Sequence, residues 1–222
     1  MRYVRVGEGE VNLVAYGSVT PDDRHLLDRY VAKLAELPIA TYNRDEQMAF
    51  WINLYNALLV RLVIDHYPVD RILDIEARPG RHDPWNLKLV EIQGHDLSLD
   101  DIEDGILGAI WEDLRVYYAL SCGALGCPDL QPVPYTGRRL EEELTDAAMG
   151  YVNDRRCVKL EDDRLIVSSI YRWHRGDFGG SDDGVISHLM AFAGPDLAMR
   201  LQHFDRISGD AFDWRLNDAP AR

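Results

Sequence analysis

A cysteine in a glycine-rich turn is the first place in this sequence where chemistry can be expected. Cys122 stands in the segment YYALSCGALGCPDL, directly after a short apolar run and before two glycines. Backbone N–H groups near a thiol at such a rim can lower its pKa, and they can also stabilise an oxyanion. Cys122 is therefore a candidate nucleophile, set against the simpler interpretation that it is a small buried apolar side chain.

Two asparagines form a second unusual pattern. Asn53 and Asn56 lie one turn apart within the apolar segment AFWINLYNALLV. A buried amide without a partner costs roughly 1–3 kcal/mol, so both side chains need hydrogen bonds. Either they brace neighbouring backbone, or they belong to a functional site.

Other signatures of catalysis are missing from the sequence. It contains no phosphate-binding loop, no dinucleotide fingerprint, no HExxH and no nucleophile elbow. Cys122 and Cys127 have no second Cys or Cys/His pair at zinc-ligand spacing, so we expect neither a metal nor a cofactor. With Cys157 they make an odd, small set, which predicts free thiols at 122 and 127 and a cytoplasmic protein.

The composition narrows the class of protein. With 222 residues and 46% hydrophobic content, the chain can build one large domain. Its net charge of −14 disfavours nucleic acids and anionic membrane surfaces as partners. The richest apolar run, ALLVRLVI, is interrupted by Arg61 and too short to span a membrane, and the start MRYVRVGEGEVN has no targeting pattern. The expected partner is a small molecule or a peptide.

The elements that would position these residues are helices and short hairpins. Thr20 is a plausible cap for a helix that begins at Pro21, and Asn43 with Glu46 can form a capping box on a helix that runs to His66. Hairpin turns are predicted at residues 93–94 and 162–163, and a strand over residues 116–121. Further helices are expected after Ser98, over residues 137–152, and from Ser181 to a stop at Gly194. This order predicts a single α+β domain over residues 1–222, with a buried central helix among short antiparallel strands.

Five segments together resemble a known family, the domain of unknown function 547. They are AFWINLYNALLVRLVIDHYP, LSLDDIEDGIL, YYALSCGALGCPDL, YTGRRLEEEL and IYRWHRGDFGG, and the resemblance runs from about Val11 to Asn217. The family has no established activity to transfer. The resemblance implies a fold distantly similar to thiol peptidases and transglutaminases, which is an analogy of fold alone.

The family's motif positions fall on residues already singled out. They are Trp51, Asn53, Tyr55, Asn56, Glu103, Cys122, Gly126, Cys127 and Pro128. The resemblance implies that the two asparagines face the glycine-rich turn and hold its backbone. The chain departs from the family at three positions, with Asp104 in place of His, Gly108 in place of Arg and Ser121 in place of Asn.

These observations lead to one leading hypothesis and one alternative. Cys122 would be the nucleophile for acyl transfer or amide hydrolysis, with Glu103 and Asp104 lining the cleft and with Asn53 and Asn56 orienting the site. Since a cysteine nucleophile needs an imidazole, His174 or His95 would replace the missing family histidine. The residues expected to bind the ligand are Trp51, Tyr55, Asn56, Ser121, Gly123 and Cys127. The alternative is a non-catalytic binding or scaffold module whose cleft holds a ligand or peptide without converting it.

Overall fold

A long helix, α2 (Arg44–His66), forms the centre of the fold in the computed structural model, which describes residues 2–7, 11–77 and 80–220. Asn43 caps it reciprocally with Glu46, as the sequence predicts: the Asn43 amide oxygen accepts from the Glu46 N–H at 2.9 Å. By length and composition alone α2 could cross a membrane, but 72% of its most apolar stretch is buried inside the protein. That burial is typical of a core helix.

Short elements surround this helix. The helices are α1 (Pro21–Ala35), a π-helical segment (Asp101–Gly108) that continues into α3 (Ala109–Trp111), α4 (Val116–Ala119), α5 (Leu140–Val152), α6 (Ile170–Trp173), α7 (Asp182–Phe192) and α8 (Pro195–Leu201). The strands are β1 (Val4–Arg5), β2 (Leu13–Val14), β3 (Val90–Ile92), β4 (His95–Leu97), β5 (Val158–Glu161), β6 (Arg164–Ser168) and β7 (Gly209–Ala211).

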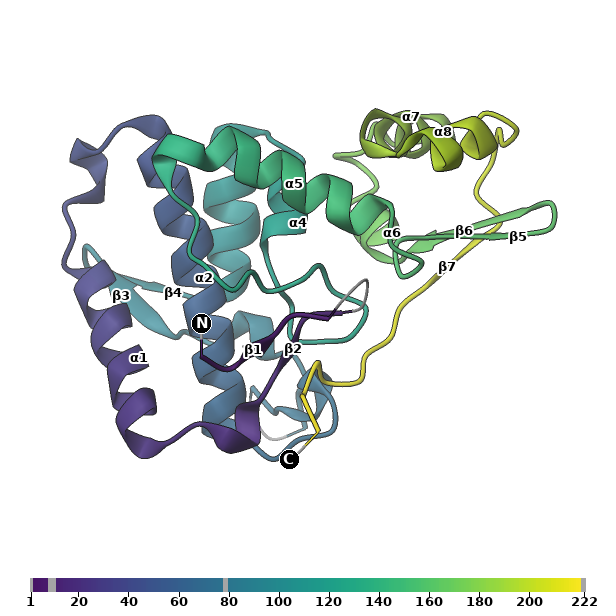
Figure 1. Ribbon diagram of the computed structural model, residues 1–222. Helices are drawn as coiled ribbons and strands as arrows, with labels where there is room; N and C mark the ends of the chain where they lie inside the picture. The colour runs from purple at the N-terminus through teal and green to yellow at the C-terminus, as the bar shows by residue number, and fades with distance from the viewer. Residues whose placement is uncertain (1, 8–10, 78–79, 221–222) are drawn as a thin grey trace.

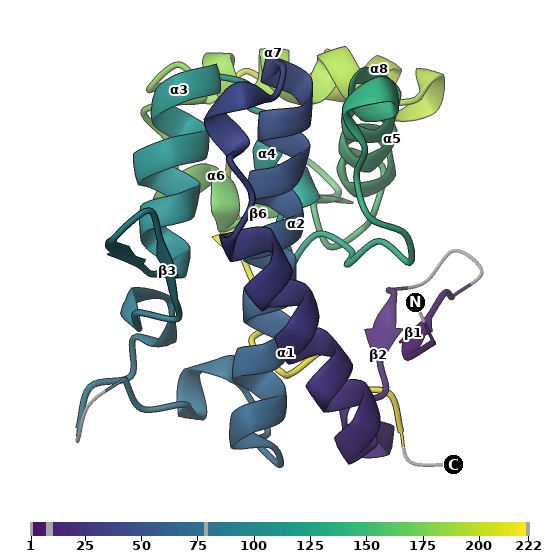
Figure 2. The ribbon, with the colours of Figure 1, turned by 90° about the vertical axis from the view of Figure 1, so that its left-hand side faces the viewer.

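The strands make three small sheets at the edges of the molecule. β1 pairs with β2 and β3 with β4, both antiparallel, while β5 and β6 form a hairpin to which β7 adds in parallel. Figure 1 shows α1 and α2 on one side and the β5–β6 hairpin with α6, α7 and α8 on the other, and Figure 2 shows α1 running alongside α2. The mixture of helices and small sheets confirms the α+β class.

Two groups of buried apolar side chains hold these parts together. The larger surrounds α2 and includes Leu54, Leu58 and Ile102, none of which exposes measurable surface. The smaller lies among α5, α7 and the β5–β6 hairpin. Burial of large aliphatic side chains is the main stabilising contribution in such a fold.

The segment after β7, residues 212–220, is called the C-terminal segment and links distant parts of the chain. After β7 has paired with β6, the segment bridges Arg71 through Arg215 and Ala124 through Leu216. In Figure 1 it runs as a yellow coil from the hairpin side to the lower end of α2. It therefore brings its residues beside the glycine-rich turn.

Several local predictions are confirmed. The Thr20 and Ser181 side chains cap α1 and α7, and both hairpins turn where expected, with Gln93 and Asp162 at positive φ. Gly194, expected to stop a helix, instead precedes Pro195 as the N-cap of α8, after α7 has ended at Phe192.

The strand predicted over residues 116–121 is wrong. Val116–Ala119 forms one helical turn, α4. Just before it, the Asp113 side chain accepts a hydrogen bond from the Arg115 N–H at 3.0 Å. Aromatic and β-branched residues favour strands only where a neighbouring strand and packing suit them. Here the Tyr118 hydroxyl lies 2.8 Å from both the Tyr171 hydroxyl and Nε2 of His188, which fixes the turn against α6 and α7.

Candidate active site

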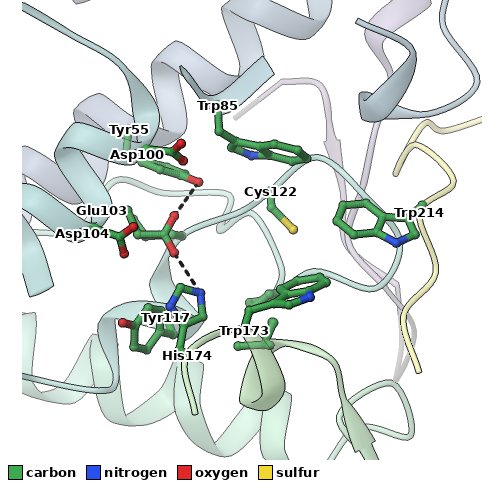
Figure 3. A pocket seen from close by; sticks show the side chains of 13 residues that line it. Tyr55, Trp85, Asp100, Glu103, Asp104, Tyr117, Cys122, Trp173, His174 and Trp214 are labelled. Carbon is green, nitrogen blue, oxygen red and sulfur yellow. Dashed lines mark hydrogen bonds and ion pairs between the residues drawn. The ribbon is translucent and has the colours of Figure 1, made fainter. Parts of the chain in front are cut away.

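One cavity collects most of the residues that could do chemistry. It has a volume of about 240 Å³ and lies where the π-helical segment, the glycine-rich turn, α6 and the C-terminal segment meet (Figure 3). Its lining consists of Tyr55, Trp85, Asp100, Glu103, Asp104, Tyr117, Leu120, Cys122, Pro128, Ile170, Trp173, His174 and Trp214.

Glu103 is held between two polar side chains on one side of this pocket. Its Oε2 accepts a hydrogen bond from the Tyr55 hydroxyl at 3.0 Å, and its Oε1 lies 3.6 Å from Nε2 of His174. Glu103 belongs to the π-helical segment, and Tyr55 comes from the buried face of α2. π-Helical turns are uncommon and often lie at functional sites.

The surroundings of Glu103 change its ionisation. Burial is the main cause that raises the pKa of the Glu103 carboxyl to about 7, with a further contribution from Asp104, while the Tyr55 hydrogen bond opposes the rise. The pKa of Asp100 is raised to about 6, first by burial and then by Asp83 and Asp104. At neutral pH Glu103 is therefore present in both protonated and ionised forms.

His174 is oriented by its neighbours. Its ring stacks at a tilt on Tyr117, with 4.1 Å between ring centroids, and its Nδ1 lies 4.0 Å from Asp177. The Tyr117 hydroxyl donates to the same Asp177 carboxylate at 2.5 Å. Burial lowers the pKa of His174 against the opposing charges of Asp104 and Asp177, so the neutral imidazole is favoured.

Three tryptophans form the other side of the pocket. Trp85, Trp173 and Trp214 come from three separate segments, and Figure 3 shows their indoles around the Cys122 side chain. The Trp85 and Trp214 rings lie 6.0 Å apart at 61°, and those of Trp173 and Trp214 lie 5.3 Å apart at 36°. Phe212 packs against the second pair, with its ring centroid 4.8 Å from that of Trp173 and 4.7 Å from that of Trp214.

The prediction of free thiols at 122 and 127 is wrong. Cys122 and Cys127 form a disulfide across the turn, with their Cα atoms 5.6 Å apart. Gly123 at φ +81° and the Cys127 N–H bond to the Ala124 carbonyl curve the chain enough to bring the two sulfurs together. Cys157 is free and buried. In this form Cys122 has no thiolate to act as a nucleophile.

No histidine among the described residues hydrogen-bonds to the Cys122 sulfur. In Figure 3 that sulfur lies on the tryptophan side, whereas Glu103 and His174 lie on the opposite side. His95, the other histidine considered, is exposed on β4 and does not line the pocket. The fold brings Cys122, Glu103, Asp104 and His174 into one cavity, but without a hydrogen bond between the cysteine and a histidine.

The two asparagines have different partners. Asn56 is buried, donates to the Ala119 carbonyl at 2.9 Å and accepts from the Ser121 N–H at 2.9 Å. This confirms that an amide of α2 holds the backbone next to Cys122. Asn53 is half-buried and pairs instead with the backbone of Tyr135, at 2.8 and 2.9 Å, away from the turn.

The other residues predicted to bind a ligand belong to the core or to the turn itself. Trp51 lies in the core against Phe50 and does not line the pocket. Ser121 is buried beneath the turn, and Cys127 is buried and accepts from the Ala124 N–H. Gly123 has φ +81°, and a Cβ there would lie 3.3 Å from Ile72. The turn therefore requires glycine at this position for its backbone conformation rather than for a ligand. Of the six predicted binding residues, only Tyr55 lines the cavity.

Sequence reasoning did not single out Asp100, Tyr117 or the three pocket tryptophans. Asp100 stands three residues before Glu103, a spacing that places both on one helix face. Trp173 precedes His174 directly. No pattern in the sequence connects Trp85 with Trp214, because they are distant in the chain and meet only in the folded protein.

The acidic side of the pocket is suited to a positive charge. Glu103, Asp104 and His174 each place one possible ligand atom within 4.8 Å of the others, a spacing that would admit a metal ion. Asp104 is exposed, however, and Glu103 is already engaged by Tyr55.

Comparison with known proteins gives a family and no function. Neither a curated protein nor a solved structure matches the chain. One family model matches residues 39–152, which includes α2, Glu103 and the glycine-rich turn and leaves out Trp173, His174 and Trp214. The chain belongs to the family described as protein of unknown function, DUF547.

Proposed function

We propose that this domain is an acid–base enzyme that hydrolyses an amide or ester of a small substrate, with Glu103 and His174 as its catalytic residues. The observation that supports this most directly is the Glu103 carboxyl between the Tyr55 hydroxyl and the His174 imidazole. A carboxyl whose pKa is raised to about 7 beside a neutral imidazole is an effective proton-transfer pair near neutral pH.

The reaction can be written with its protons accounted for. Neutral His174 accepts a proton from water as the water oxygen forms a bond to the acyl carbon. Protonated Glu103 donates its proton to the leaving nitrogen or oxygen as the bond from that atom to the acyl carbon breaks. The proton on His174 then returns to Glu103 across their contact, which restores the starting state.

A pH profile and a set of variants test this proposal. p-Nitrophenyl acetate and p-nitroacetanilide would be assayed with the oxidised protein. We expect a bell-shaped profile, because His174 must be neutral and Glu103 protonated. Glu103→Gln and His174→Gln should each lower the rate on the order of 10²-fold or more. His203→Gln, which alters an exposed histidine outside the pocket, is the matched control.

Three results would contradict the proposal. Turnover that is unchanged in Glu103→Gln would remove the role of the acid–base pair. Turnover that EDTA abolishes and zinc restores would assign Glu103, Asp104 and His174 to a metal instead. Saturable ligand binding without turnover in any variant would favour the binding module.

A second candidate is supported by the position of Cys122. Its half-buried side chain lines the pocket, whereas Cys127 is buried, so reduction by a dithiol would leave a thiol facing the cavity. In that form the Cys122 sulfur would form a thioester with the acyl carbon, and the thiol proton would pass to the leaving group as its bond to that carbon breaks. Water would then hydrolyse the thioester and restore the thiol. A rate that rises with reductant and is lost in Cys122→Ser would favour this mechanism, and a rate retained in Cys122→Ser/Cys127→Ser would favour water.

The same features support proposals for the type of ligand and for the location of the protein. We propose a small organic ligand rather than a nucleic acid or a membrane surface, because the net charge is −14. Disulfides persist mainly in oxidising compartments, so the Cys122–Cys127 bond supports an exported protein over the cytoplasmic one expected from cysteine number. Alkylation of the protein isolated from its native cells without reductant would distinguish the two locations.

A further inference from the structure

The tryptophan side of the pocket has the form of a box rather than a platform. Trp85 and Trp173 face the space around Cys122 from opposite sides, and Trp214 closes a third side (Figure 3). Neighbouring indole planes are inclined to each other at 61° and 36°, so the three rings do not form one flat surface.

The fourth side of the box is acidic. Asp100, Glu103 and Asp104 line the same cavity, and the 13 described residues that line it include no lysine or arginine. Glu103 is neutral when it acts as the acid, so the negative charge here comes from the aspartates beside it, and no basic side chain of the lining neutralises that charge. An anionic ligand would meet repulsion from the carboxyls and from the net charge of the whole chain.

We infer that this box binds an alkylated ammonium group of the substrate. Indole faces attract cations through their quadrupole, and convergent aromatic rings are the common way to bind quaternary ammonium groups. The cation would lie in the cavity against these indoles, with the carboxyls on the opposite side. The inference names the substrate class of the proposed hydrolase and in that respect rests on the proposed function.

The size of the cavity agrees with this ligand. A volume of about 240 Å³ holds a compact group of a few heavy atoms together with the bond to be cleaved. Trp173 is 41% exposed, so this wall of the pocket lies at the protein surface and the rest of a substrate can extend outward past it. The ammonium group would then position the ester or amide near Glu103 and His174.

Calorimetric titration with choline tests the inference, with 3,3-dimethylbutan-1-ol as the neutral molecule of the same shape. We expect saturable binding of choline and roughly fivefold to thirtyfold weaker binding of the neutral molecule. Trp173→Leu and Trp214→Leu keep an apolar side chain but remove the indole face, so each should weaken choline binding by several-fold. Trp111→Leu, which changes an indole outside the pocket, should leave it unchanged.

Three results would overturn the inference. They are equal binding of choline and the neutral molecule, no binding of choline at millimolar concentrations, and equal weakening by the Trp111 and Trp173 variants. Thermal unfolding monitored by circular dichroism would establish that each variant is folded. The failure of the proposed function is a separate result: hydrolysis would not depend on Glu103, while wild-type choline binding would persist.

Discussion

Replacing Glu103 by glutamine should stabilise the protein in a pH-dependent way. In the folded chain the pKa of this carboxyl is raised from 4.5 to about 7, mainly because burial disfavours the ionised form. Below pH 4.5 the carboxyl is protonated in both the folded and the unfolded chain and carries no penalty. As the pH rises to about 7, the unfolded chain loses its proton first, so stability falls and stays low above that pH.

The size of the effect follows from these two pKa values. At about 1.4 kcal/mol per pKa unit, a rise from 4.5 to about 7 corresponds to about 3 kcal/mol of lost stability at pH 8. Glutamine cannot ionise and still accepts from the Tyr55 hydroxyl. The free energy of unfolding of Glu103→Gln minus that of the wild type should therefore rise by up to about 3 kcal/mol between pH 4 and pH 8. The charge of Asp100 contributes to the raised pKa of Glu103, so this interaction is part of the measured difference.

Urea unfolding followed by tryptophan fluorescence from pH 4 to pH 8 measures this difference. Glu161→Gln is a control of opposite sign, because a hydrogen bond from Lys159 lowers the pKa of the exposed Glu161 carboxylate. The stability from Glu161 is present above its unfolded pKa and is lost as the pH falls, so this variant should lose stability only at the higher pH values. A difference for Glu103→Gln that stays constant with pH would refute the raised pKa.

Three further outcomes can be measured. Asn56→Ala should lower the free energy of unfolding by about 2–4 kcal/mol, because it leaves a buried carbonyl and a buried N–H beside the turn without partners; a loss below 1 kcal/mol in urea unfolding would contradict this. Under denaturing, non-reducing conditions only Cys157 should react with iodoacetamide, as mass spectrometry would show by a single adduct, and reduction should cost about 2 kcal/mol of stability. Gly123→Ala should destabilise by about 1–2 kcal/mol, because φ is +81° and its Cβ would crowd Ile72. Gly150→Ala in α5 has open space and should be neutral or slightly stabilising, so equal effects of the two glycine variants would count against the argument.

Local features of the fold could be predicted because their partners are close in the sequence. Thr20, Asn43 and Ser181 each bond to an N–H three residues later, so a short segment contains the whole interaction. The hairpin turns at residues 93–94 and 162–163 depend on equally local geometry. The same holds for the apolar residues that cover most of α2.

The remaining features depend on contacts that sequence spacing does not contain. Residues 116–119 have the composition of a strand but no neighbouring strand, so their contacts with α6 and α7 decide the conformation. The disulfide depended on the curvature of a turn, which a separation of five residues permits but does not require. Glu103 and His174 were both expected in the cleft, whereas the three indoles meet only because the C-terminal segment returns across the molecule.

The path of the C-terminal segment has a consequence for the order in which the protein acquires its shape during synthesis. The ribosome makes α2, the π-helical segment and the glycine-rich turn long before β7 and Trp214. A nascent chain that ends before residue 209 already contains Tyr55 and Glu103 but lacks the strand that completes the β5–β6 sheet and the indole that closes the box. The acidic side of the pocket can thus form while the chain is still growing, whereas the aromatic side also needs β7 and Trp214 to emerge. The pocket is therefore complete only once the segment after β7 has docked beside the glycine-rich turn.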